Sequence, residues 1–385
     1  MQKNFTEQHL AFRKSVSAWV QNELAPYALE WDEAGIFPKT VFTKAGQLGL
    51  LGIRQDPAYG GLGLDYWYTV IFVEELTRAH NAGVAMALMV QAEIATPIID
   101  EIGSDEQKSL FLQPAMTGEK IAALGISEPN CGSDVANLQT TAREEGDDLV
   151  INGSKMWITN GTRADFITLA VRTGENGHRG ISLVTFPTDV TGYSVAQKLK
   201  KVGNLSSDTA IIYFDNCRIP KRYILGEKNN GFKYIMSNFQ GERLVAAISA
   251  TETMENMLKD TITYGKEREA FGTPILNFQV WRHKIIENMA KAKAAKCLAY
   301  QAVSSFDAYL HKKQPDIPVD EISMAKLFCC DVAQQVAYDC QQFHGGMGYV
   351  TESVVARAWR DLRLLTIGGG TSEIMKEILS KRLLQ

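Results

Sequence analysis

The sequence lacks the residue spacings that mark a metal-binding or disulfide-rich protein. None of its six cysteines belongs to a Cys-x-x-Cys pair, and none of its six histidines has a second histidine four residues away. Structural metal sites and small disulfide frameworks usually show such spacings. We therefore predict that the protein has no metal site and keeps reduced thiols in an intracellular compartment.

The sequence also lacks a strong charge and a long hydrophobic run. Its net charge is −4 and it has no block of lysine and arginine, which argues against nucleic-acid binding. The longest apolar run, from Ala82 to Val90, is far shorter than the roughly 18 residues of a membrane-spanning helix. Residues 1–14 do not have the basic region followed by an apolar region that a secretory signal shows. We expect a soluble protein without stable membrane insertion.

The first third of the chain has the apolar spacing of helices. The 385 residues suffice for two or three domains, and 45% hydrophobic with 22% charged residues is typical of globular proteins. Thr6 is expected to cap a helix that ends before Pro26, and Ser104 with Gln107 forms a capping-box pattern. The predicted helices after the first cover residues 41–50, 66–79, 84–99 and 105–116. The helix over 84–99 is almost wholly apolar, which predicts deep burial.

From about Ala122 the pattern changes to short β-branched and aromatic runs separated by glycine, asparagine and aspartate. These predicted strands cover residues 149–151, 157–159, 166–171, 181–186 and 210–214. After Pro220 the helical spacing returns, over residues 230–264, 277–312, 318–343 and 371–383. We predict an α+β protein with a helical domain over 1–121, a β-barrel or sandwich over 122–228 and a four-helix bundle over 229–385.

The helix that begins near Asn230 carries an unusual carboxylate. Apolar residues at steps of three and four form one stripe, and Glu242 lies beside Phe239 and Ala246 on that side. A desolvated glutamate has a raised pKa and can remove a weakly acidic C–H proton near neutral pH. On spacing alone, a glutamate followed by Arg243 is more often ordinary surface charge.

Two segments of the β domain have the composition of a ligand site. The loop Ile126–Asp134 combines small polar residues with proline and glycine, so it offers hydroxyl and backbone N–H groups at close range. In Lys155–Gly161, Trp157 could cover an aromatic ring while Thr159 donates to its heteroatoms. For this second segment alone, a core tryptophan on an ordinary strand is the stronger interpretation.

Five segments together resemble the acyl-CoA dehydrogenase family, and the resemblance covers essentially the whole chain. They are Ile126–Asp134, Gly153–Gly161, Glu267–Gln279, Gln341–Tyr349 and Arg360–Leu379. Each segment is moderately specific alone, whereas their order and spacing together are strongly specific. The resemblance implies non-covalently bound FAD, an acyl-CoA thioester substrate, a homotetramer and an electron-transfer flavoprotein as the electron acceptor.

The resemblance also implies which residues contact the cofactor. The positions around the flavin ring match Leu124, Ile126, Ser127, Trp157, Ile158 and Thr159. Ser133 matches a contact shared by the cofactor side and the pantetheine arm of CoA. The contacts to the diphosphate and adenine match Arg268, Phe271 and Gln279 of a neighbouring subunit, and the remaining FAD contacts match Gln342, Phe343, Gly345, Gly346, Thr371 and Glu373. An arginine and a helix N-terminus both suit a diphosphate.

The catalytic base departs from the commonest family pattern. In many members it is a glutamate at the position held here by Gly369, which has no side chain. A subgroup that includes isovaleryl-CoA and long-chain acyl-CoA dehydrogenases places its glutamate on the helix with a Glu-Arg pair, and Glu242-Arg243 matches that pair. The resemblance thus implies Glu242 as the base, the N–H of Gly369 as a donor to the thioester oxygen, and substrate contacts from Gln240, Arg243, Gly370 and Ser133.

The activity implied is dehydrogenation of an acyl-CoA between Cα and Cβ to the trans-2-enoyl-CoA. The alternatives are an acyl-CoA oxidase, a dehydrogenase of acyl-carrier-protein thioesters, and a catalytically silent relative that acts as an assembly or binding partner. Ala92, Ala95 and Thr96 are expected to line a deep acyl pocket, which favours medium-to-long or methyl-branched chains over short branched ones. The expected location is the bacterial cytoplasm or, after removal of a transit peptide, the mitochondrial matrix.

Overall fold

The structure is a computed structural model, and it describes residues 4–385. The expectation that residues 1–14 contain no secretory signal falls in part on residues 1–3, which lie outside the described residues. The first third is helical, as expected. Thr6 caps α1 as predicted, and it forms a capping box with His9 that the sequence does not predict; the predicted capping box of Ser104 with Gln107 is present. Its helices are α1 (Glu7–Glu23), α2 (Ala28–Ala34), α3 (Thr40–Gln47), α4 (Tyr66–Thr77), α5 (Ala82–Met89), α6 (Pro97–Ile102), α7 (Asp105–Gln107) and α8 (Gln113–Met116).

The buried helix of this part is longer and less regular than the sequence predicts. A π-helical segment, Val90–Ala95, joins α5 to α6, so that helical structure runs from Ala82 to Ile102. The stretch is long and apolar enough to cross a membrane by length and composition, which corrects the expectation that none would be. However, 83% of its most apolar window is buried inside the protein. It therefore serves as a core helix.

The middle of the chain forms one eight-stranded sheet in the order β6-β7-β3-β2-β4-β5-β8, with β1 paired to β4. The path is open at β6 and β8, so of the two expected forms it is not a closed barrel. The strands are β1 (Ala122–Gly125), β2 (Thr141–Glu145), β3 (Asp148–Thr159), β4 (Phe166–Arg172), β5 (Ile181–Pro187), β6 (Tyr193–Lys198), β7 (Thr209–Pro220) and β8 (Ile224–Leu225).

Strand β3 joins two runs that the sequence separates. Asn152-Gly153 is not a turn between strands, because β3 continues through it and the pairing with β7 shifts register there. Gly153 has φ +147°, and a Cβ at this position would lie 2.6 Å from Thr140 Oγ1. The dipeptide forms a β-bulge at which a neighbouring strand approaches too closely for any side chain.

The last third contains three long helices, α9 (Gly231–Glu267), α10 (Gln279–Leu310) and α11 (Val319–Phe343). The shorter α12 (Val354–Leu362) packs on α9 and α11, and α13 (Ser372–Leu383) packs on α11. A two-stranded hairpin, β9 (Glu269–Ala270) with β10 (Thr273–Pro274), joins α9 to α10. The last third is helical, as predicted, and it contains the four predicted helices together with a short additional helix, α12.

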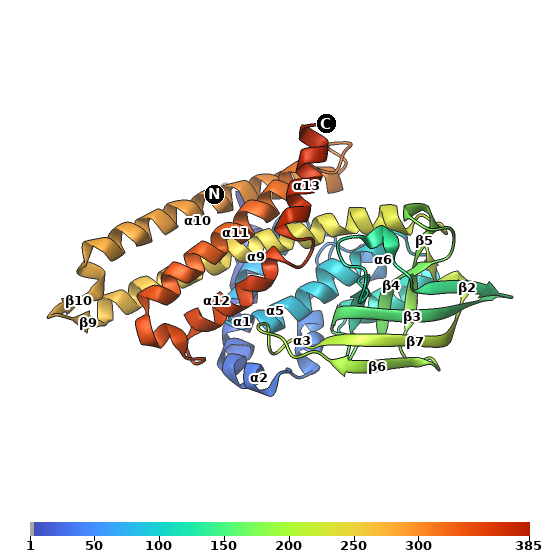
Figure 1. The fold of residues 1–385 in the computed structure, drawn as a ribbon, viewed down its shortest axis with the longest axis horizontal. Coiled ribbons are helices and arrows are strands. Elements are labelled where there is room, and N and C mark those ends of the chain that lie inside the picture. The colour runs from blue at the N-terminus through green and yellow to red at the C-terminus, as the bar shows by residue number, and fades with distance from the viewer. Residues whose placement is uncertain (1–3) are drawn as a thin grey trace.

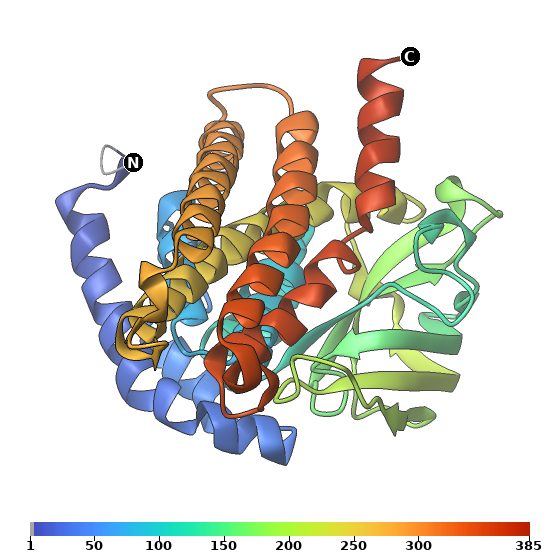
Figure 2. The same cartoon turned by 60° about the vertical axis from the view of Figure 1, so that its left-hand side comes forward.

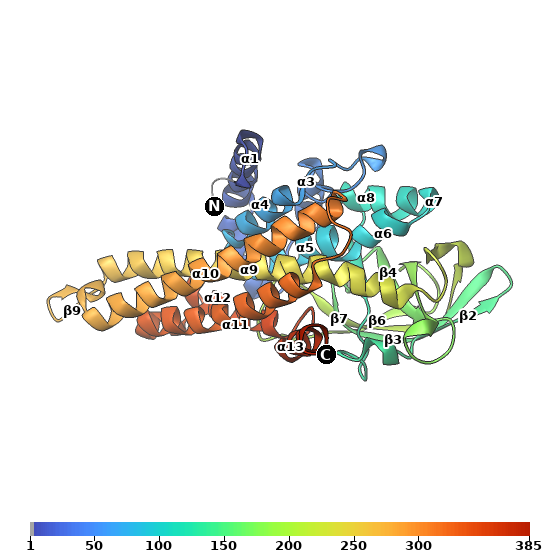
Figure 3. The same ribbon diagram turned by 90° about the horizontal axis from the view of Figure 1, so that it is seen from above.

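Helix α9 contacts the sheet, the first helical part and the other long helices. It begins beside β5, where Asn230 bridges to Ile181, and ends at the β9–β10 hairpin at the opposite tip of the molecule (Figure 1). Figure 2 shows α10 and α11 side by side on one side of α9, with α13 standing apart from them. In Figure 3 the helices of the first third lie beside the part of α9 nearer the sheet, and the sheet lies at that end of the molecule.

Candidate active site

Glu242 and Gly369 face the same space, although they are 127 positions apart in the sequence. A Cβ built on Gly369 would lie 3.3 Å from Glu242 Oε1 and 3.6 Å from its Cδ. Gly369 has φ +66°, a conformation that costs a residue with a side chain about 1 kcal/mol or more. The carboxylate of α9 therefore fills the volume that a side chain at position 369 would take.

The surroundings of Glu242 suit a proton acceptor. Its side chain is partly buried, and within residues 4–385 it takes part in no ion pair. Burial raises the pKa of the carboxyl above its ordinary value, while the charges of Arg243 and Lys326 act in the opposite direction. A carboxylate without a partner in a shielded position is the arrangement in which a glutamate gains basicity.

Two cations from different helices hold the loop that contains Gly369. Arg243 Nε donates to the carbonyl of Gly369 over 3.3 Å, and its guanidinium lies 5.9 Å from the centre of the Phe239 ring. Lys326 of α11 donates from Nζ to the carbonyl of Gly370. Burial lowers the pKa of both cations. Arg243, which the sequence places on the substrate side, thus also anchors the loop.

Lys326 is absent from the residues predicted from sequence. It is 0% exposed and lies in the helical stripe Ile322, Ala325, Cys329 and Ala333. A lysine in an otherwise apolar stripe is the signal that identifies it, because such a side chain is rarely buried without a specific reason. Gln240 is a second polar residue in a buried position. Its Oε1 has no hydrogen-bond partner among residues 4–385, while its Nε2 donates to the carbonyl of Met236.

The loop at the start of the middle domain is tied to strand β3. Met156 N donates to the carbonyl of Ser127 over 2.9 Å, and buried Lys155 Nζ donates to the carbonyl of Ile126 over 3.0 Å. The same ammonium forms a 2.8 Å ion pair with Glu128. Burial alone would raise the pKa of Glu128, but Lys155 and hydrogen bonds from the loop lower it below its ordinary value. These contacts bring Ile126 and Ser127 to β3.

Trp157 adopts a strained backbone conformation at this point. It has φ +65°, which is rare for a bulky residue, and its ring is 58% exposed. The pairing of β3 with β7 shifts register between Lys155 and Ile158, so Trp157 lies in a second bulge. The bulge leaves a large aromatic face open while Ile158, 2% exposed, points into the sheet core. Such strain usually marks a functional position, and the open ring corrects the core-tryptophan interpretation.

The predicted site residues lie in two separate groups in the molecule. The first group comes from two parts of the chain: the start of the middle domain and β3 contribute Leu124, Ile126, Ser127, Ser133, Trp157, Ile158 and Thr159, and α9 with the Gly369 loop contributes Glu242, Gly369, Gly370, Thr371 and Glu373. Around the β9–β10 hairpin lie Arg268, Phe271, Gln279, Gln342, Phe343, Gly345 and Gly346. Figures 1 and 3 show that the hairpin is far from the sheet, so a single chain does not bring the two groups together.

The hairpin group is largely exposed. Phe271 has φ +53° and is 97% exposed, and the segment of residues 342–346 follows α11 beside Tyr264, whose ring stacks on His344. Phe343 differs from the others, because its ring is buried against Trp281. At the other end, Thr371 caps α13 by accepting from Ile374 N, and Glu373 lies exposed in the first turn.

A cavity lies between α5, α9 and α12, and the residues of α9 that line it follow Glu242 in the helix. Ala92, Ala95 and Thr96 do not line it. All three are buried elsewhere, and the Thr96 hydroxyl donates to the carbonyl of Gln91. The cavity wall from the buried helix comes instead from Ala82, Ala85, Met86 and Met89. The expectation that Ala92, Ala95 and Thr96 line an acyl pocket therefore stays a prediction, and a different part of the helix lines this cavity.

Comparison with known proteins identifies the family. Sequence models of the acyl-CoA dehydrogenase N-terminal, middle and C-terminal domains match residues 6–119, 123–217 and 229–384. The chain is 36% identical over 382 residues to the long-chain specific acyl-CoA dehydrogenase, mitochondrial, of Sus scrofa, covering 98% of this chain and 87% of the relative. It is 34% identical over 384 residues to isovaleryl-CoA dehydrogenase, mitochondrial, of Arabidopsis thaliana, covering 98% and 92%.

Solved structures have the same fold. A probable acyl CoA dehydrogenase from Mycobacterium abscessus superposes with a TM-score of 0.94 at 38% identity, covering 98% of this chain and 99% of that one. A chain in a structure described as the electron transferring flavoprotein of Acidaminococcus fermentans has a TM-score of 0.94 at 32% identity and full coverage of both chains, 100% each. Taken with the three domain matches, these similarities show that the chain belongs to the acyl-CoA dehydrogenase family of FAD-dependent oxidoreductases.

Proposed function

We propose that the protein dehydrogenates an acyl-CoA thioester between Cα and Cβ, with Glu242 as the proton acceptor. The observation that carries the proposal is the position of the Glu242 carboxylate, 3.3 Å from the place of a Cβ on Gly369. The carboxylate is partly shielded from water and has no ion-pair partner among the described residues, so it is available to take the Cα proton.

The loop of Gly369 supports the same reaction. As the proton leaves Cα, negative charge grows on the thioester oxygen, and a fixed backbone N–H is a suitable donor to it. The hydrogen bonds from Arg243 and Lys326 to the carbonyls of Gly369 and Gly370 hold this loop before substrate binds. Gln240, with a buried and unpaired Oε1, lies one half-turn before Glu242 and is proposed to contact the substrate.

The residues near the end of β3 suit a planar aromatic cofactor. Bound FAD would supply the acceptor for the hydride that leaves Cβ. We propose that the open face of Trp157 packs on the flavin and that Ser127 and Thr159 provide polar contacts, because the strained bulge keeps that ring out of the core. Thr371 and Glu373, at the N-terminus of α13, complete this part of the cofactor site in the proposal.

The hairpin group is proposed to complete the FAD site of a second copy. Phe271 is 97% exposed and Arg268 is exposed at the tip of the chain, far from Trp157. A homotetramer, in which a neighbouring copy supplies Arg268, Phe271, Gln279 and the segment of residues 342–346, would bring the two groups together. We also propose 1–121, 122–228 and 229–385 as the domain boundaries, which limited proteolysis can test.

The proposed electron acceptor is an electron-transfer flavoprotein, and the similarity to a chain in the Acidaminococcus fermentans structure supports it. The alternatives are an oxidase that reduces oxygen and an enzyme that acts on acyl-carrier-protein thioesters. Release of hydrogen peroxide during turnover would identify the oxidase. Since relatives come from mitochondria and from bacteria, the matrix and the bacterial cytoplasm both stay open as locations.

The main test is anaerobic reduction of the purified yellow protein by acyl-CoA substrates, with Glu242→Gln as the variant. We expect the variant to retain FAD and its oligomeric state but to lose turnover by roughly a hundred- to ten-thousand-fold. Glu287→Gln, which changes an exposed glutamate of α10, is the matched control and should behave as the unaltered protein. Near-normal turnover in Glu242→Gln would show that another group takes the proton.

A second test exchanges the two positions. The double variant Glu242→Gly with Gly369→Glu should recover part of the turnover that Glu242→Gly alone loses, because the two positions share one space. The recovery will be incomplete, since the left-handed backbone at position 369 is strained for glutamate. No gain over Glu242→Gly would mean that a carboxylate at position 369 does not reach the substrate Cα.

A further inference from the structure

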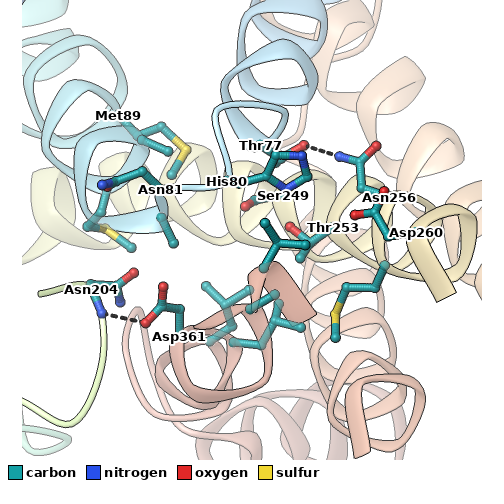
Figure 4. A pocket seen from close by; sticks show the side chains of 18 residues that line it. Thr77, His80, Asn81, Met89, Asn204, Ser249, Thr253, Asn256, Asp260 and Asp361 are labelled. Atoms are coloured by element: carbon teal, nitrogen blue, oxygen red, sulfur yellow. Dashed lines mark hydrogen bonds between the residues drawn. The ribbon is translucent and has the colours of Figure 1, made fainter. Parts of the chain in front are cut away.

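The cavity beyond Glu242 is lined by a polar stripe of α9 as well as by apolar residues. Ser249, Thr253, Asn256 and Asp260 line it, at steps of three and four along the helix (Figure 4). Glu242 and Ala246 continue the same stripe toward the active site. The opposite wall, Ala358, Leu362 and Leu365, leads directly into the Gly369 loop. The cavity and the proposed base therefore lie along one face of one helix.

His80 lies at this polar end in a strained conformation. Its backbone has φ +51°, uncommon for a residue with a bulky side chain, and its ring lines the cavity with Ser249 and Asp260 (Figure 4). Burial lowers the pKa of His80 below its ordinary value, although the charge of Asp260 acts in the opposite direction. A neutral imidazole offers one donor and one acceptor nitrogen.

Several polar groups in the cavity have no partner within the protein. Among residues 4–385, no hydrogen bond or ion pair engages the side chains of His80, Ser249, Thr253 or Asp260. By contrast, Asn256 Nδ2 donates to Thr77 Oγ1 over 2.9 Å, and Asp361 accepts from Asn204 N over 2.8 Å. A bare alkyl chain would displace water from the four unpaired groups without replacing its hydrogen bonds, which is unfavourable.

We propose that this cavity binds the distal part of an acyl chain that carries a neutral hydroxyl group. The hydroxyl would donate to Asp260 or accept from His80, with Thr253 and Ser249 alongside. A chain that ends in a carboxylate is disfavoured, because Asp260 and Asp361 both line the cavity. The inference rests on the proposed function, since it assigns the far end of the same substrate.

The helix sets the position of the hydroxyl. With a rise of about 1.5 Å per residue, Ser249 lies about 10 Å and Thr253 about 16 Å along α9 from Glu242. An extended chain advances about 1.2 Å per bond, since a residue of three backbone bonds spans about 3.5 Å. Thr253 is therefore level with the end of a chain of about fourteen to sixteen carbons. The matching probe is ω-hydroxy-hexadecanoyl-CoA.

The experiment measures kcat/KM of the FAD-loaded protein with hexadecanoyl-CoA, its ω-hydroxy derivative and its ω-carboxy derivative. We expect the hydroxy derivative to be preferred over hexadecanoyl-CoA by at least about tenfold, the effect of one good hydrogen bond. The carboxy derivative should be the poorest of the three. Equal values, or a preference for the unsubstituted chain, would overturn the inference.

Two variants locate the effect. Thr253→Val keeps the shape but removes a hydroxyl, and Asp260→Asn removes a charge; each should reduce the preference for the hydroxy derivative by about threefold or more. Lys266→Gln, on an exposed part of α9, is the control and should keep the preference. An unchanged preference in both cavity variants would place the hydroxyl elsewhere. Failure of all three thioesters and of shorter acyl-CoAs to reduce the flavin would instead contradict the proposed function.

Discussion

Lys155 in the sheet and Lys326 in the helical bundle are both 0% exposed, yet their partners differ. Lys155 is paired with Glu128 at 2.8 Å and also donates to the carbonyl of Ile126. Lys326 donates only to the carbonyl of Gly370 among the hydrogen bonds of the described residues, and it forms no ion pair there. The charge of Lys326 lowers the pKa of Glu242, although the two side chains form no ion pair.

This difference indicates that Lys155 mainly supports the fold, whereas Lys326 mainly affects the pKa of Glu242. A buried ion pair whose members satisfy each other fixes a loop, and its removal mainly affects stability. A buried cation without a counterion is costly in itself, so its presence beside the proposed base is better explained by its effect on Glu242 and on the Gly369 loop. The predictions below start from this contrast.

The largest effect is expected for Lys155→Met. The variant leaves Glu128 buried without its partner and should lower the free energy of unfolding by about 3–5 kcal/mol. Since the pKa of Glu128 is lowered in the folded protein, the loss should be full at neutral pH and shrink as the pH falls below the ordinary glutamate value of about 4.3. Denaturant unfolding at several pH values measures both. A loss below about 1 kcal/mol would remove the supporting role.

A smaller effect is expected when the partner is neutralised as well. Glu128→Gln added to Lys155→Met should recover about 1–3 kcal/mol of the lost stability, because the uncompensated charge is gone while the amide can still contact the loop. The coupling comes from a double-mutant cycle of the four proteins. Strict additivity of the two single changes would mean that the 2.8 Å contact carries no energy.

The smallest effect on stability is expected for Lys326→Met, because this change leaves no buried counterion. Its effect should appear in the pH dependence of turnover. The charge of Lys326 lowers the pKa of Glu242, so removing it raises that pKa, and the acidic limb of kcat moves to higher pH by up to about one unit. Stopped-flow reduction of the flavin over a pH series measures the shift. A stability loss as large as that of Lys155→Met would show that Lys326, like Lys155, mainly supports the fold.

Much of the fold could be predicted because its signals are local. The helix cap at Thr6, the capping box at Ser104 and the helical stripe around Glu242 depend on neighbours within a few turns, and all three are present. Asn152-Gly153 was misinterpreted as a turn because the same dipeptide also suits a bulge, and only the distant Thr140 distinguishes the two. The short α12 was missed between two glycine-rich segments that resemble loop.

The site was less predictable wherever its geometry depends on packing between distant elements. The closeness of Glu242 and Gly369 follows from the docking of α9 against the segment before α13, which no local pattern encodes. The lining of the cavity by Met86 and Met89 has the same origin, since the sequence of their helix does not reveal which face borders a cavity. Lys326, by contrast, could have been selected from its place in an apolar stripe.

Helix α9 is a single uninterrupted helix of 37 residues. Because its backbone carries both the proposed base and the polar end of the cavity, no hinge lies between the reacting carbon and the tail of the substrate. One turn of about 5.4 Å spans roughly four carbon atoms of an extended chain. Enlarging a residue such as Ala246 or Ser249 would therefore shorten the accepted acyl group in steps of about four carbons, and the helix acts as a fixed measure of chain length.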